Sequence, residues 1–83
     1  MSYRVHVRVM PRVGLLDPQG QTVIGALGAL GFREVATVSI GRAIELTVRA
    51  DSKDEAEARA RQMCDRLLAN PVTEDYQLEV EEA

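Results

Sequence analysis

Few side chains of this sequence belong to the types that do chemistry, and they stand far apart. His6 is the single histidine and Cys64 the single cysteine of the 83 residues. His6 could serve as a general base, but no nucleophile is evident near it, which favours a solvated or ion-paired surface histidine. Cys64 follows Met63 on the apolar side of a predicted helix, where a buried structural thiol is expected. One histidine and one cysteine do not supply the usual ligands of a metal site.

The stretch GLLDPQGQTV, residues 14–23, has the glycine content of a phosphate-binding loop but not its spacing. Neither GxxxxGKS/T nor GxGxxG occurs in it. Asp17 suits the N-cap of a helix and Pro18 its first position, so a capped helix start is expected here. Arg12 and the helix N-terminus could also attract an anion, so an anion-binding loop stays open as an alternative interpretation.

Composition and charge exclude several classes of protein. The chain has 46% hydrophobic residues, which is ordinary for a globular protein, and a net charge of −3. An acidic chain does not suit general nucleic-acid binding, because that binding needs a basic face. A lone cysteine builds no disulfide framework, and neither a signal peptide nor a membrane-spanning stretch is recognised. We therefore expect a single cytoplasmic domain over residues 1–83.

Periodicity predicts the elements that must position these side chains. Alternating apolar residues predict strands at 3–10, 35–40, 43–50 and 76–81, and helical spacing predicts helices at 17–30 and 51–69. Ser52 and Glu55 form a capping box at the start of the second helix. Gly41-Arg42 is expected to join the second and third strands as a tight hairpin.

The resulting order, β-α-β-β-α-β, is that of the ferredoxin-like, or split βαβ, α+β fold. We expect an antiparallel four-stranded sheet with the two helices on one face and the first strand between the third and the last. The open face of that sheet would bring opposite charges side by side. Its charged residues would be Arg4, His6, Arg8, Glu45, Arg49, Glu79 and Glu81.

Other classes of protein with this fold depend on particular residues, so the sequence can be checked for each class. An acylphosphatase needs an asparagine on the third strand, which RAIELTV lacks, and a copper chaperone needs a CxxC pair. An RNA-recognition motif stacks bases on exposed aromatic residues, whereas the open face here is charged. An ACT-like module, which binds small molecules across a dimer interface, stays open as an alternative.

The most specific signal is the order of four stretches: GLLDPQGQTV, ALGALGF, VSIGRAIEL and CDRLLANPVTEDYQLEV. Together they resemble the small PurS-type subunit of phosphoribosylformylglycinamidine (FGAM) synthase, from Val5 to Glu81. That ligase of de novo purine synthesis converts formylglycinamide ribonucleotide, ATP and glutamine to FGAM, ADP, phosphate and glutamate. The resemblance implies a non-catalytic adaptor subunit that bridges a PurL-type synthetase and a PurQ-type glutaminase and supports ammonia transfer.

The resemblance also implies partners and cofactors. It implies a homodimer or tetramer and no cofactor or metal held by this subunit, while the complex uses ATP and Mg²⁺. The composition adds the expectation that the chain binds neither nucleic acid nor membrane. No residue is expected to be catalytic. Since loops on rigid scaffolds often carry function, we expect subunit contacts in the loops 12–19 and 70–75. The candidate contact residues are Arg12, Asp17, Pro18, Gln19, Asn70, Pro71 and Asp75.

Overall fold

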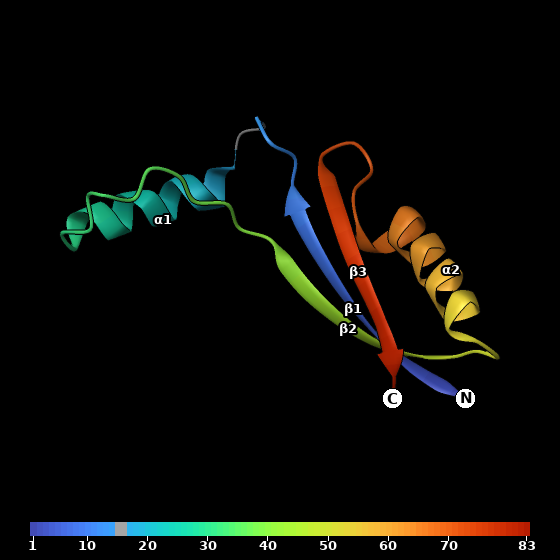
Figure 1. Ribbon diagram of the computed structural model, residues 1–83. Coiled ribbons are helices and arrows are strands. Elements are labelled where there is room, and N and C mark those ends of the chain that lie inside the picture. Colours follow the sequence, from blue (N-terminus) through green and yellow to red (C-terminus); the bar gives the residue numbers. More distant parts are fainter. Residues whose placement is uncertain (15–16) are drawn as a thin grey trace.

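The computed structural model describes residues 1–14 and 17–83. Along the chain it has β1 (Ser2–Pro11), α1 (Pro18–Ala29), β2 (Arg42–Arg49), α2 (Lys53–Met63), the π-helical turn η1 (Cys64–Leu68) and β3 (Glu74–Glu82). The strands form an antiparallel sheet in the order β2-β1-β3, so the first strand lies in the middle as predicted (Figure 1).

The predicted four-stranded sheet is wrong: the sheet has three strands. Residues 35–40, expected as the second strand, run as an irregular segment beside α1, and Gly41-Arg42 therefore closes no hairpin (Figure 1). The physical reason is that β-branched residues favour a strand only where a neighbouring strand supplies hydrogen bonds. Within this chain the segment leads away from the sheet, so no described strand lies beside it.

The prediction that both helices cover one face is also wrong. α2 lies across one face of the sheet, mainly over β1 and β3. α1 instead projects away from the end of the sheet, with residues 32–41 returning alongside it (Figure 1). We call residues 17–41 the arm. Among the described residues, none of the buried apolar core belongs to the arm.

The core forms between β1 and α2 because their small and β-branched residues match in spacing. Val5, Val7 and Val9 alternate along β1 and are at most 2% exposed. Ala56, Ala60 and Cys64 recur every fourth residue on α2 and η1 and are fully buried. The other core members are Tyr3, Ala50, Ala69 and Val80.

The helical spacing of residues 51–69 predicts that Leu67 shares the buried side of the second helix with Cys64, and this is wrong, since Leu67 is 82% exposed. The π-helical turn that begins at Cys64 changes the direction of the side chains that follow it. Cys64 itself is buried, as predicted.

The predicted helix ends are largely confirmed. Asp17 caps α1, and Gly31, with φ of +99°, follows its last turn in the left-handed region. Ser52 Oγ accepts the Glu55 N–H at 3.1 Å, while the Glu55 carboxylate reaches back to the N–H of Asp51. Both helices therefore start where the capping residues indicate.

Candidate subunit interface

Arg12, directly after β1, connects to the loop that precedes β3. Its Nη2 donates to the Pro71 carbonyl oxygen at 2.6 Å, and its Nε donates to Asp75 Oδ1 at 3.2 Å. Its backbone N–H donates to the Thr73 carbonyl oxygen at 2.9 Å. Three of the candidate contact residues, Arg12, Pro71 and Asp75, therefore form one cluster at the end of the sheet from which the arm leaves.

Asp17 holds the two halves of the arm together. Oδ1 accepts the N–H of Gly20 at 3.0 Å, and Oδ2 accepts the N–H of Ile40, on the returning segment, at 2.8 Å. These hydrogen bonds, that of Ile40 first, lower the pKa of the Asp17 carboxyl. The next two candidate residues, Pro18 and Gln19, are exposed in the first turn of α1.

A hollow of about 630 Å³ lies where the arm leaves the sheet. Its walls come from the end of β1, from α1 and from residues 36–39. Arg12, Asp17 and Gln21 give it polar groups, and Ile24 and Val38 give it apolar ones. Such a mixed, open hollow suits side chains of another protein better than a buried cofactor.

Asn70, the remaining candidate, shapes its own loop. Its Oδ1 accepts the N–H of Val72 at 2.9 Å, and its N–H donates to Glu74 Oε1 at 2.8 Å. The structure therefore divides the candidate residues between two neighbouring places: the Arg12 cluster with its loop, and the first turn of α1. Whether they contact other subunits stays a prediction.

Sequence reasoning missed Arg42 and Glu74, which fasten β2 to the start of β3. Arg42 Nη1 and Nη2 donate to the two oxygens of Glu74 at 2.8 and 2.9 Å, and Nη2 also donates to the Leu68 carbonyl oxygen at 2.6 Å. The sequence did contain an indication of this contact. Arg42 alternates in step with Ile44 and Leu46, so all three share one face of β2. A charged residue at an apolar position of a strand indicates a partner on that face.

A second, smaller hollow of about 150 Å³ lies beside this contact, between η1 and the start of β3. Cys64, Asp65 and Tyr76 line it, and the Tyr76 hydroxyl donates to Asp65 Oδ1 at 3.0 Å. Burial is the main cause that raises the pKa of both the Cys64 thiol and the Tyr76 hydroxyl. A buried thiol with a raised pKa is a poor nucleophile, which agrees with the structural role predicted for Cys64.

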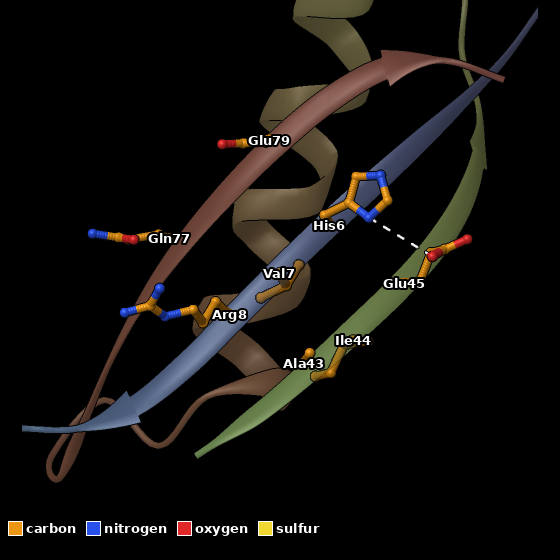
Figure 2. Close-up of a pocket in the computed structure, with 8 residues that line it drawn as sticks. All are labelled: His6, Val7, Arg8, Ala43, Ile44, Glu45, Gln77 and Glu79. Carbon is orange, nitrogen blue, oxygen red and sulfur yellow. Dashed lines mark ion pairs between the residues drawn. The ribbon is translucent and has the colours of Figure 1, made fainter. Parts of the chain in front are cut away.

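The open face of the sheet is charged, as predicted. His6 Nε2 lies 3.0 Å from Glu81 Oε1 and His6 Nδ1 lies 3.7 Å from Glu45 Oε2, the pair marked in Figure 2. Arg4 contacts the same two carboxylates at 3.4 and 3.5 Å. The hydrogen bond with His6 is the main cause of a lowered pKa at Glu81. Among the described residues, no serine, threonine or cysteine lines the adjoining hollow of about 430 Å³, so none of them offers His6 a nucleophile to activate there.

Within residues 1–14 and 17–83, no group of three or more His, Cys, Asp or Glu side chains is placed to hold a metal ion. None of the helices in that part of the chain is long and apolar enough to cross a membrane.

The comparisons with known proteins agree with the resemblance seen in the sequence. Residues 4–82 match the family model described as PurS: phosphoribosylformylglycinamidine (FGAM) synthase. The chain belongs to the PurS family. The prediction that it is a PurS-type small subunit of FGAM synthase is confirmed at this level, and so is its assignment to a ligase complex.

Relatives of the PurS family match almost end to end. The FGAM synthase subunit PurS of Bacillus subtilis is 44% identical over 80 residues, which cover 96% of this chain and 94% of that one. The corresponding subunit of Methanocaldococcus jannaschii is 34% identical over 79 residues, 95% of each chain.

Solved PurS structures share the three-dimensional arrangement. A crystal structure of B. subtilis PurS matches with a TM-score of 0.87 at 44% identity and covers 96% of this chain and 99% of that one. A structure of PurLQS from Thermotoga maritima matches with a TM-score of 0.88 at 28% identity and covers 98% and 99% of the two chains. The arm is therefore part of a fold that solved PurS chains also have.

Proposed function

We propose that this chain is the non-catalytic adaptor of a cytoplasmic FGAM synthase, which pairs with itself and joins the synthetase and glutaminase subunits. The single observation that carries the proposal is the PurS family match over residues 4–82. The likeness to a chain in a structure of PurLQS supports PurL-type and PurQ-type partners.

The chemistry of ammonia explains why such an adaptor is needed. Ammonia released from glutamine is mostly protonated in neutral water, and the ammonium ion is not a nucleophile. A route that excludes water between the two active sites preserves the reactive form. A subunit that only positions those active sites can therefore be essential for glutamine-dependent synthesis while ATP and Mg²⁺ act on the synthetase subunit.

The surface from which the arm leaves the sheet is the proposed contact region. It combines the exposed Pro18 and Gln19, the Arg12–Asp75 pair and the hollow of about 630 Å³. The Arg12 contacts hold the two loops in one arrangement, so this surface is prepared before a partner binds. Preorganisation of this kind lowers the entropic cost of association.

Reconstitution tests the proposal. The two larger subunits are assayed for FGAM formation with glutamine and with ammonium chloride, each with and without this chain. We expect the chain to raise the glutamine-dependent rate at least about tenfold and to change the ammonia-dependent rate little. Equal glutamine-dependent rates with and without the chain would contradict an adaptor role, and a saturable thermal shift with a free amino acid would then favour an ACT-like module.

Charge-introducing variants locate the contact surface. Gln19→Arg, at the start of α1, is expected to reduce the glutamine-dependent rate of the reconstituted enzyme. The matched control is Gln62→Arg, which adds the same charge to an exposed position of α2. Equal effects of the two variants would assign the loss to charge in general and not to the candidate interface.

A further inference from the structure

Both ends of the arm are fastened to one short segment of the core. We call residues 68–75, which run from the last residue of η1 into β3, the anchor turn. Arg12 lies just before the chain leaves for the arm, and Arg42 is the first residue after the chain returns. The described hydrogen-bond acceptors of the two guanidinium groups all belong to the anchor turn: Pro71 and Asp75 for Arg12, Leu68 and Glu74 for Arg42.

The anchor turn is itself held in one shape. The N–H of Asn70 donates to the Glu74 carboxylate at 2.8 Å, and the N–H of Glu74 donates back to the Asn70 carbonyl oxygen at 2.8 Å. The backbone N–H of Arg12 donates to the Thr73 carbonyl oxygen at 2.9 Å, which ties the end of β1 to the same turn. A turn closed on itself by reciprocal hydrogen bonds offers the two arginines a fixed support.

The returning chain also touches β1 directly. A side chain at Gly41 would collide with the carbonyl oxygen of Val9, so the backbone just before Arg42 lies against the last part of β1. Glycine allows this close approach because it has no Cβ atom. The chain therefore enters β2 in contact with β1, and Arg42 then fastens it to the anchor turn.

Few other contacts define the direction of the arm. None of the described core residues belongs to it, and α1 lies apart from α2 and projects beyond the end of the sheet (Figure 1). Asp17 joins α1 to Ile40 on the returning segment, so the arm behaves as one body. α1 is about 18 Å long, so a rotation of about 10° at the root of the arm would shift its far end by roughly 3 Å. Misplacements of about 1 Å already cost enzymes large factors in rate.

We propose that Arg12 and Arg42 are positioning residues, which set the direction of the arm relative to the sheet by fastening both of its ends to the anchor turn. Arg42 contributes more, because it contacts both oxygens of Glu74 at 2.8 and 2.9 Å, and this side chain is 19% exposed against 71% for Asp75. A two-pronged contact between a guanidinium and a carboxylate fixes direction as well as distance. The proposal rests on the adaptor role proposed above and assigns the groups that hold the candidate contact surface in its geometry.

Pulsed electron paramagnetic resonance on the full chain tests the direction of the arm. Spin labels at Ala29→Cys and Asp54→Cys report the distance between the far end of α1 and α2, while the buried Cys64 stays unlabelled. Dilution with excess unlabelled chain restricts the measured distances to labels within one chain. We expect a narrow distribution, and we expect Arg42→Gln to widen it at least about twofold or to shift its maximum by roughly 3 Å.

Arg49→Gln is the matched control, because it makes the same substitution at an exposed position at the other end of β2. Its distribution should equal that of the wild type. Arg42→Lys keeps the charge without the two-pronged contact and should give an intermediate width. Arg12→Gln removes only exposed contacts, so it should widen the distribution less, and it decides the question if Arg42→Gln does not fold. Distributions unchanged in both Arg42→Gln and Arg12→Gln, or changed as much by Arg49→Gln, would overturn the proposal.

The reconstituted synthase shows whether this direction matters. With the wild-type chain we expect equal amounts of glutamate and FGAM, because ammonia passes between the active sites without loss. Arg42→Gln should raise the ratio of glutamate to FGAM at least about twofold, while the rate with ammonium chloride and the ratio with Arg49→Gln stay unchanged. An unchanged ratio would overturn a positioning role in the synthase. If the wild-type chain leaves the glutamine-dependent rate unaltered, the adaptor role fails, and the distance distributions still decide whether the two arginines direct the arm.

Discussion

At the scale of single residues, Glu74 connects three parts of the chain. Its carboxylate accepts from the Arg42 guanidinium and from the N–H of Asn70. The side chain is 19% exposed, which makes it the least exposed member of the ion pairs within the described residues. The hydrogen bonds from Arg42 are the main cause that lowers the pKa of this carboxyl below its ordinary 4.5.

The lowered pKa predicts how stability depends on pH. A carboxyl with a lower pKa in the folded state stabilises the fold above its unfolded pKa, and this contribution is lost as pH falls through the folded value. We expect Glu74→Gln to lower Tm by several degrees at pH 7 and to have a much smaller effect near pH 3. Thermal unfolding of wild type and variant over this range measures the difference.

Arg49→Ala provides the control for Glu74, because it removes an exposed charge from the far end of β2. It should change Tm little at either pH. If Glu74→Gln lowers Tm equally at both pH values, the loss comes from packing and not from the Arg42–Glu74 pair.

The role of an individual residue was predictable from the sequence where it depends only on neighbours within a few residues. Asp17 and Ser52 cap helices because their side chains reach amides two or three residues ahead, and Cys64 is buried because it shares a helix side with Ala56 and Ala60. The Arg42–Glu74 contact was not predictable, because it joins residues 32 apart in the sequence. The sequence indicates that Arg42 needs a partner, but it does not specify that the partner is Glu74.

At the scale of elements, the arm depends on Gly20. A side chain there would collide with the carbonyl oxygen of Val38, so the returning segment packs directly on the backbone of α1. Gly25 and Gly28, the other two glycines of α1, have no neighbour within 4 Å at the position of an added methyl group. Of the three glycines of α1, Gly20 is therefore the one that leaves no room for a side chain.

Gly20→Ala is expected to separate the returning segment from α1. The hydrogen bond from the Ile40 N–H to Asp17 should then open, and the Ile40 amide should exchange at least about tenfold faster. Gly25→Ala is the matched control, because its methyl group meets nothing and favours the helix by roughly 1 kcal/mol. Exchange at Ile40 that is unchanged in both variants would contradict a close contact between the two halves of the arm.

The elements themselves were mostly predictable, and their assembly was not. The alternation at residues 3–10, 43–50 and 76–81 gave three real strands, because each finds a neighbour in the same chain. The same pattern at residues 35–40 gave none. A segment forms a strand only when a second strand lies beside it, and the alternation of one segment does not show whether such a neighbour exists.

At the scale of the whole molecule, stability should depend on protein concentration. The described arm residues add nothing to the core cluster, which leaves a single chain with a thin core, so we expect self-association to contribute to the stability of the fold. We expect Tm to rise by several degrees between about 2 and about 200 µM protein, as mass action requires for a dimer that unfolds to monomers. Circular dichroism in cells of different path length measures it, and a Tm independent of concentration would contradict the coupling.

The central position of β1 has a consequence for how the chain folds during synthesis. β1 is made first, yet its last neighbour is β3, so that Tyr3 lies opposite Glu82. A growing chain therefore keeps one edge of its first strand unpaired, and Val5, Val7 and Val9 incompletely covered, until β3 has been translated. Pairing across so many residues slows folding, and during that interval the unpaired edge of the valine-rich strand is open to association with other chains.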